Sequence, residues 1–329
     1  MTSRRLLAVT AALLVALAGC TGAGGGGSTP SAAPSASSGA CATTPAPSAD
    51  TVATWQGAQA PSIFPLIIDP GVLACGPNRM MFSFLDAKNL PVASPDRSVK
   101  VAVFDLGAST ETPVATADAE FIWAIEGERG VYVANVDLPT AGAYGAAFTT
   151  QLGDAAPEVI KVTFDSRPQR TVVSVGDAAP TSDTPTLGDV GGDVTRISTD
   201  TDPVKAFYEV SVADALTAKQ PFVLVFATPK FCATAQCGPT LDRIKPIAAA
   251  HPDLTVINVE PYQLQEVDGQ LQPVLSGDPP ALTPATWTDE WKLPSEPWVF
   301  VVDRDGIVQG SFMLVVGDDE LEAAIKAVS

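Results

Sequence analysis

The chain has 329 residues, of which 37 are Asp or Glu and 19 are Lys or Arg, so its net charge is −18 at pH 7. Such an acidic surface repels nucleic acid and anionic lipid headgroups, and we expect no nucleic-acid partner. The chain contains one His and five Cys, too few soft or imidazole ligands for a copper site, and we expect neither a metal ion nor another cofactor.

The first twenty residues have the organisation of a secretory signal peptide. Two arginines precede the apolar run Leu6–Ala18, which is too short to cross a bilayer as a stable helix, and small residues follow it. The Leu-Ala-Gly-Cys ending at residues 17–20 resembles a bacterial lipobox, which implies cleavage after residue 19 and attachment of a lipid to the Cys20 thiol. The other interpretation is an ordinary secretory signal in which Cys20 is incidental. We expect a lipoprotein on the extracytoplasmic face of the cell membrane, held there by its N-terminal lipid rather than by charge.

Residues 20–50 are expected to form a flexible tether. They are almost entirely Gly, Ser, Thr, Ala and Pro, with no large apolar side chain to offset the entropy of ordering them. About 280 residues follow the tether, which indicates two folded domains. The predicted boundaries place a first domain at 51–167, a linker at 168–185 and a second domain at 186–329.

The first domain alternates apolar and polar side chains in short runs, which is the pattern of β-strands with one buried face. Clusters of Pro, Gly, Asp and Asn separate these runs. The number and spacing of the runs favour an antiparallel β-sandwich of immunoglobulin-like size, which we expect to act as a spacer or to dock a partner. Strands are predicted at 78–85, 98–106, 120–125, 130–138, 142–149 and 158–164.

The second domain alternates strands with helices. The continuous apolar run 221–226 predicts a strand that is buried on both faces. A helix is predicted at 239–250 with Pro239 in its first turn, where a missing N–H has no cost. The remaining predicted elements are a strand at 254–259, a short helix at 283–291, a hairpin at 298–303 and 307–314, and a final helix at 319–328.

Two segments of the second domain carry a family resemblance. Phe231-Cys232 follows the first strand, and Cys237-Gly238-Pro239 opens the helix, an order that resembles the active-site turn of thioredoxin-like proteins. Residues 295–308 (SEPWVFVVDRDGIV) are similar to the cis-proline loop, strand and β-turn of that family. The resemblance implies a TlpA-like α/β thioredoxin fold for residues 186–329.

The same resemblance implies a site made of Cys232, Cys237 and a cis Pro297, with the proline against the cysteine pair and binding the substrate backbone. The chain departs from the family pattern in two ways. Four residues separate the cysteines instead of two, and Thr240 occupies the place of the second thiol in a Cys-Gly-Pro-Cys motif.

The two cysteines are candidate catalytic residues on chemical grounds as well. A thiolate at a helix N-terminus is stabilised by unpaired backbone N–H groups and by the helix dipole, which lowers the pKa of the thiol. Cys237 has that position, and Cys232 in the preceding loop would resolve a mixed disulfide. The opposite assignment, with Cys232 attacking, stays open. No acid on the strand 222–226 could move protons, so proton transfer falls to water or to Glu296.

Cys41 and Cys75 remain as a second pair if Cys20 is acylated. An even set of cysteines in an oxidising compartment favours a structural disulfide between them, which would attach the end of the tether to the first domain. Free thiols at both positions are the alternative.

The function that these features predict is a membrane-anchored thiol-disulfide oxidoreductase. Its partners would be extracytoplasmic protein thiols or a membrane redox partner, with Cys232 and Cys237 cycling between dithiol and disulfide. An alternative is a non-catalytic cell-surface binding or scaffold protein in which this pair is a structural disulfide. A thiol peroxidase is a further alternative, because Pro229, Thr234 and Cys237 lie one residue away from the spacing of peroxiredoxins.

Three other features are predicted to be structural. Met80 and Met81 point to opposite faces of one strand and therefore fill core space. His251 ends a helix, where a cation complements the helix dipole. Residues 303–306 form a hairpin turn that lacks the further oxygen ligands of a calcium loop.

Overall fold

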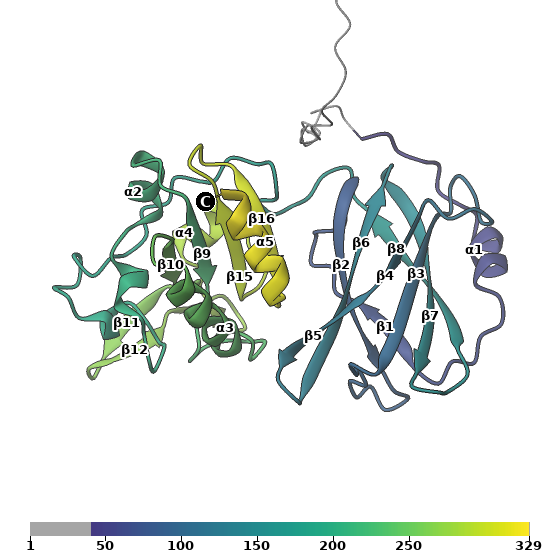
Figure 1. Cartoon of the computed structure of the whole chain (residues 1–329), viewed down its shortest axis with the longest axis horizontal. Helices are drawn as coiled ribbons and strands as arrows, with labels where there is room; N and C mark the ends of the chain where they lie inside the picture. The colour runs from purple at the N-terminus through teal and green to yellow at the C-terminus, as the bar shows by residue number, and fades with distance from the viewer. Residues whose placement is uncertain (1–40, 329) are drawn as a thin grey trace, which may run out of the picture. The chain divides into compact units, whose positions relative to one another are not determined.

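The computed structural model describes residues 41–328 (Figure 1). The predicted signal peptide, the lipid attachment at Cys20 and the first part of the predicted tether lie outside the described residues. Within the described part of the chain, no helix is both long enough and apolar enough to span a membrane.

The described chain begins with a segment attached to the first sheet region by a disulfide between Cys41 and Cys75. Helix α1, Ala49–Gln56, follows, and the side chain of Ser48 caps it by accepting a hydrogen bond from the Thr51 N–H. Trp55 on α1 is buried beside Phe104. The last residues of the expected tether therefore already contact the β-rich region.

Residues 64–166 form two four-stranded antiparallel sheets that face each other as a β-sandwich (Figure 1). One sheet has the order β1-β2-β6-β5, and the other has the order β4-β3-β7-β8. The strands are β1 Phe64–Ile67, β2 Gly76–Leu85, β3 Arg97–Asp105, β4 Ala115–Asp118, β5 Glu120–Ile125, β6 Arg129–Leu138, β7 Gly142–Leu152 and β8 Glu158–Ser166.

The alternation predicted from the sequence is visible in the sandwich core. On β3, Val99, Val101 and Val103 are buried, and the residues between them are exposed or half-buried. Aromatic rings fill the centre, where Phe82 lies 4.7 Å from Phe148 between ring centroids. All six predicted strands are confirmed, and the structure adds the four-residue strands β1 and β4 at the sheet edges.

The C-terminal region is built on a second kind of sheet, with the order β10-β9-β15-β16. Strands β9 and β10 are parallel, and the other two pairs are antiparallel. Its strands are β9 Phe222–Phe226, β10 Thr255–Val259, β15 Trp298–Val302 and β16 Val308–Met313. Its helices are α2 Val212–Thr217, α3 Cys237–Ala250, α4 Thr286–Glu290 and α5 Asp318–Val328, preceded by 3₁₀ turns Val194–Arg196 and Lys205–Tyr208.

Strand β9 is buried on both faces, as the apolar run predicted. Val223 and Val225 belong to a core that includes Leu241 of α3 and Ile325 of α5. The alternate residues of β9 face a second core that contains Trp291. The sheet is therefore covered on both sides, which fixes the position of the loop that leaves the end of β9.

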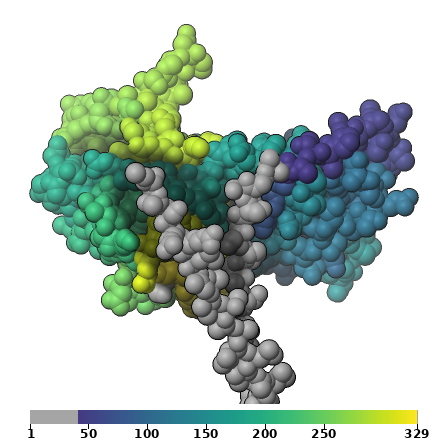
Figure 2. Space-filling view, turned by 90° about the horizontal axis from the view of Figure 1, so that it is seen from above, coloured from purple at the N-terminus to yellow at the C-terminus, as the bar shows by residue number. Residues whose placement is uncertain are grey.

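Residues 264–282 form an arm between β10 and α4. It consists of two small antiparallel hairpins, and Figure 2 shows the yellow-green part of it projecting from the surface. Its base is closed by backbone hydrogen bonds from the Gln263 N–H to the Thr283 carbonyl, at 2.9 Å, and from the Ala285 N–H to the Pro261 carbonyl, at 2.9 Å. The hairpin strands are β11 Leu264–Val267, β12 Gln270–Pro273, β13 Leu275–Ser276 and β14 Ala281–Leu282.

Candidate active site

Cys232 and Cys237 form a disulfide at the point where the loop after β9 enters α3. The Cα atoms of the two residues lie 6.0 Å apart. Cys237 is the first residue of α3 and is 0% exposed, whereas Cys232 in the loop is only partly buried. One sulfur of the pair is therefore closer to solvent than the other.

The first N–H group of α3 points at the more exposed sulfur. The Cys237 N–H donates a hydrogen bond to Cys232 Sγ, with 3.2 Å between nitrogen and sulfur. The Thr234 hydroxyl oxygen lies 3.4 Å from the same sulfur. The positive end of the helix therefore acts on Cys232, although the sequence analysis favoured Cys237 for this role.

A buried carboxyl group lies beside the disulfide. Glu296 is 2% exposed, and one of its oxygens accepts a hydrogen bond from the Ala233 N–H at 2.8 Å. The Thr234 hydroxyl donates to the Glu296 backbone carbonyl at 3.0 Å. The two sulfurs and a carboxylate oxygen of Glu296 all lie within 4.8 Å of one another. Sequence reasoning had named water or Glu296 as the proton carrier, and a carboxylate oxygen of Glu296 lies near both sulfurs.

Pro297 follows this glutamate and directly precedes β15. The peptide bond between Glu296 and Pro297 is cis. The Pro297 carbonyl accepts a hydrogen bond from the Leu314 N–H at 2.9 Å, so this carbonyl is already used within the β15–β16 hairpin. Glu296, rather than Pro297, supplies the polar groups of this loop that contact the cysteine loop.

Tyr262 holds the second oxygen of the carboxylate. Its hydroxyl donates to Glu296 Oε2 at 2.5 Å. Burial raises the pKa of Tyr262 above its usual range, and the adjacent Glu296 carboxylate raises it further. Sequence reasoning missed Tyr262. Because β9 and β10 are parallel, their carboxyl ends share one edge of the sheet, and this rule would have placed the residues after β10 near the cysteine loop.

Glu260 is a second buried acid at the same edge of the sheet, immediately after β10. It is 5% exposed, and its Oε1 accepts a hydrogen bond from the Thr199 N–H at 2.6 Å. Its Oε2 is buried without a hydrogen-bond partner. Burial raises the pKa of Glu260 to about 7, although the side chain of Thr228 and the side chain and N–H of Thr199 oppose this shift. The sequence analysis did not identify this residue.

The site has little positive charge of its own. No ion pair within residues 41–328 involves Glu296. Lys230 is the nearest base in sequence, but its Nζ donates to the Leu271 carbonyl at 3.1 Å and lies 5.3 Å from the centroid of the Phe231 ring. The lysine thereby connects the cysteine loop to the arm, and the buried carboxylate has no cationic side chain as its partner.

The residues predicted to be structural lie elsewhere. Met80 and Met81 are both buried, in two different hydrophobic clusters. His251 Nε2 lies 3.0 Å from a carboxylate oxygen of Glu322 on α5. Asp303 Oδ1 accepts backbone hydrogen bonds within the β15–β16 turn. None of these groups joins the cysteines.

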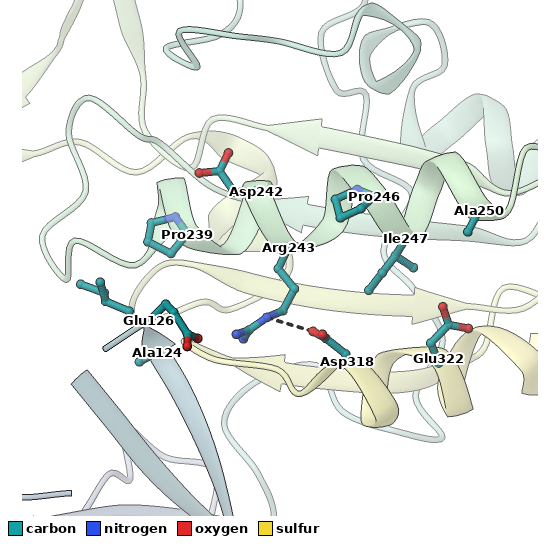
Figure 3. A pocket seen from close by; sticks show the side chains of 11 residues that line it. Ala124, Glu126, Pro239, Asp242, Arg243, Pro246, Ile247, Ala250, Asp318 and Glu322 are labelled. Atoms are coloured by element: carbon teal, nitrogen blue, oxygen red, sulfur yellow. Dashed lines mark ion pairs between the residues drawn. The ribbon is translucent and has the colours of Figure 1, made fainter. Parts of the chain in front are cut away.

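A cavity of about 660 Å³ is lined in part by α3 and α5 (Figure 3). Figure 3 shows Arg243 of α3 directed toward Asp318 of α5, an ion pair with 3.0 Å between nitrogen and oxygen. The lining contains neither cysteine nor Glu296. The candidate site is therefore defined by the chemistry of the disulfide rather than by the size of a cavity.

Comparisons with known proteins give no family for the chain. No family model and no curated protein matches it. A solved structure of a DUF4426 family protein from Pseudomonas aeruginosa PAO1 is similar at 11% identity and a TM-score of 0.24, over 34% of this chain and 97% of that one. MtrC from Shewanella baltica OS185 is similar at 11% identity and a TM-score of 0.22, over 48% of this chain and 32% of that one. Both scores are too low to carry an argument about fold or function.

Proposed function

We propose that the chain is a membrane-anchored, extracytoplasmic thiol-disulfide oxidoreductase with a TlpA-like, thioredoxin-like C-terminal domain. The observation that carries this proposal is the environment of Cys232. Cys232 is the less buried residue of the pair, and its sulfur is bonded to Cys237, accepts the first N–H of α3, and lies within 4.8 Å of the buried Glu296 carboxylate. A disulfide that serves only as a crosslink needs neither of the last two features.

The order of elements supports the thioredoxin-like assignment. A strand, a helix and a parallel strand, β9-α3-β10, precede an antiparallel hairpin and a final helix, β15-β16-α5. The disulfide lies at the carboxyl end of β9, which is the edge of an open α/β sheet where reactive groups collect.

The first step of the reaction follows from the difference in exposure. A client thiolate attacks Cys232 Sγ, the accessible sulfur, and forms a mixed disulfide with it. The bond between Cys232 and Cys237 breaks, and its electron pair leaves on Cys237 Sγ as a thiolate. Of the two assignments that the sequence left open, this one makes Cys232 the client-facing sulfur and Cys237 the resolving sulfur.

The second step completes the exchange. A second client thiol attacks the client sulfur of the mixed disulfide, which releases the oxidised client and leaves Cys232 as a thiolate. The N–H of Cys237 stabilises that thiolate. The Glu296 carboxyl group is within reach of both sulfurs and carries the proton that each thiol gains or loses. Run in reverse, the same steps reduce a client disulfide.

The location is proposed from the leader and from the bonded cysteines. The lipobox-like ending at Cys20 would attach a lipid at the N-terminus of the mature chain. The described residues contain two disulfides, and disulfides persist in oxidising, extracytoplasmic compartments. Protein thiols of that compartment, or a membrane redox partner, are the proposed reaction partners.

Trapping of mixed disulfides tests the proposal. The Cys237→Ser variant keeps the client-facing sulfur. Its Cys232 thiolate should attack disulfide-containing peptides, displace one peptide thiol and accumulate mixed disulfides, which a reductant releases. The Cys232→Ser variant should form none, because its remaining thiol is buried. Equal trapping by both variants would contradict the assignment, and the absence of trapping by either would contradict thiol exchange.

A binding or scaffold protein is the second candidate function. The complete burial of Cys237 favours it, since inert structural disulfides are commonly sealed from solvent. Replacing both Cys232 and Cys237 with Ser separates the candidates. Intact folding with lost thiol exchange supports the oxidoreductase, whereas lost stability in a chain that never exchanged thiols supports the scaffold.

A further inference from the structure

We propose that the reduced form of the same site binds a divalent zinc ion through Cys232, Cys237 and Glu296. No metal ion was expected from the sequence, because one His and five Cys are too few soft or imidazole ligands for a copper site. The structure supplies a third ligand from a distant part of the chain. This inference uses the residues of the proposed oxidoreductase but does not depend on thiol exchange.

The three ligand atoms are close enough for one ion. Tetrahedral zinc with bonds of about 2.3 Å to sulfur and 2.1 Å to oxygen holds its ligand atoms about 3.6 to 3.8 Å from one another. The two sulfurs and the Glu296 oxygen already lie within 4.8 Å of one another while the disulfide is closed. Opening the disulfide separates the sulfurs toward the spacing that zinc needs. Cys232 lies in a loop, so it can move without unwinding α3.

The carboxylate is held in position before any ion arrives. The Tyr262 hydroxyl, at 2.5 Å, and the Ala233 N–H, at 2.8 Å, fix its two oxygens. Such outer contacts orient ligands in metal sites and increase affinity. Each carboxylate oxygen has a further lone pair available for coordination.

The charge of the site also favours a cation. Glu296 is 2% exposed, and no Lys, Arg or His of the described residues forms an ion pair with it. A buried carboxylate without a charged partner is unfavourable. Reduction of the disulfide would add up to two thiolates beside it, and a divalent cation offsets that negative charge.

The site differs from a closed structural zinc centre in its number of ligands. Three protein ligands leave the fourth tetrahedral position free for water or for an incoming thiol. Cys232, the ligand in the loop, is only partly buried. Borderline-soft zinc suits a mixed set of thiolate and carboxylate ligands better than calcium or magnesium does.

Zinc binding requires that the disulfide between Cys232 and Cys237 is reduced first. A thiol reductant first transfers two electrons and two protons, which converts the disulfide into two thiols and oxidises the reductant. Zinc then replaces both thiol protons, so that two protons are released for each ion bound. The oxidised chain has no free thiolate at this site and does not bind.

Zinc titration of the full chain tests the inference. The reduced chain should bind one equivalent of Zn²⁺ in competition with a chromophoric chelator, and the oxidised chain should bind none at this site. Co²⁺ as a probe should produce sulfur-to-metal charge-transfer absorption. The Glu296→Gln variant should weaken binding by more than the Tyr262→Phe variant, for which the expected loss is about tenfold.

Matched double variants control for the other cysteines. The Cys41→Ser/Cys75→Ser variant should keep the equivalent of zinc, and the Cys232→Ser/Cys237→Ser variant should lose it, with Cys20 present in both. Unchanged affinity in Glu296→Gln, or zinc retained without Cys232 and Cys237, would overturn the inference. A chain that binds zinc but exchanges no thiols would remove the proposed function and leave the zinc site standing.

Discussion

The two disulfides of the described chain differ in the length of chain that each encloses and in their neighbours. Cys41 and Cys75 are 34 residues apart, whereas Cys232 and Cys237 are five apart. Closing a loop of 34 residues removes more entropy from the unfolded chain, worth about 4 kcal/mol of stability compared with about 2 kcal/mol for a loop of five. The first bond is therefore the better crosslink.

The shorter-range disulfide, between Cys232 and Cys237, has more polar groups around it than the disulfide between Cys41 and Cys75. Within residues 41–328, Cys75 Sγ lies 3.3 Å from the Pro139 carbonyl and has no carboxylate near it. Cys232 Sγ has a helix N–H, a hydroxyl and a buried carboxylate near it. Groups that stabilise a thiolate and carry a proton matter only when the bond opens. The comparison shows that reactivity depends on what surrounds a disulfide and stability on what it encloses.

The largest expected effect is on thiol exchange. The Cys232→Ser variant should reduce a model disulfide substrate at least about a thousandfold more slowly than the wild type, because the client-facing sulfur is gone. The Cys41→Ser/Cys75→Ser variant should exchange thiols at the wild-type rate. Insulin reduction followed by turbidity measures both. A similar loss of exchange rate in both variants would contradict the prediction that only the Cys232–Cys237 disulfide is reactive.

Stability should change in the reverse order. Removing the bond between Cys41 and Cys75 should lower the free energy of unfolding by about 4 kcal/mol, and removing the bond between Cys232 and Cys237 by about 2 kcal/mol. Urea denaturation without reductant, followed by tryptophan fluorescence, measures the difference. A larger loss from the second pair would show that this bond serves mainly as a crosslink.

Carboxyl groups in the two regions should respond oppositely to pH. Burial raises the pKa of Glu260 from 4.5 to about 7. The folded chain thus holds a proton that the unfolded chain releases between these values, so stability should fall by about 3 kcal/mol as pH rises through this window. Denaturation at several pH values should show this loss in the wild type and a nearly flat profile in Glu260→Gln.

Asp69 of the sandwich region has a lowered pKa, in contrast to the raised pKa of Glu260. Burial raises the pKa of Asp69, but hydrogen bonds from the Leu73 N–H and Arg167 outweigh burial and hold the pKa below 3.8. Its contribution to stability is present above that value and is lost as pH falls further. Asp69→Asn should therefore lower stability by a constant amount at neutral pH and change the slope of the profile only in its acid limb. A changed slope between pH 4.5 and 7 would contradict this division.

The smaller of the two effects on thiol exchange concerns the proton carrier. Glu296→Gln keeps the size of the side chain but cannot accept a proton, so exchange should slow by about a hundredfold. The loss should come with a changed pH–rate profile, which a purely structural role would not produce. Glu290→Gln, on the nearby helix α4, is a control that should leave the profile unchanged.

Most strands and helices could be predicted from the sequence because each depends on a polarity pattern within a short segment. Alternating polarity located six strands of the sandwich, and the apolar run at 221–226 located β9 within one residue. Helix α3 begins at Cys237 rather than at Pro239 because proline is tolerated throughout a first turn, so its position does not fix the first residue. The edge strands β1 and β4 were missed because four residues give little periodicity.

Only part of the candidate site could be predicted from the sequence, for a related reason. The cysteines are neighbours in sequence, and Glu296 could be named from its place before Pro297. Tyr262 and Glu260 were missed because they follow a different strand, β10, rather than the strand that leads to the cysteines. Their positions depend on which strands pair, and pairing between distant segments is not contained in any local pattern.

The closed base of the arm at residues 264–282 has an evolutionary consequence. Because the chain leaves and returns through hydrogen-bonded neighbours at 261–263 and 283–285, the hairpins can be lengthened, shortened or exchanged without displacing Tyr262 from its carboxylate. Lineages could thus diversify what approaches the sulfurs while leaving the reactive chemistry intact. The arm is the natural place to graft foreign loops when recognition is to be redesigned.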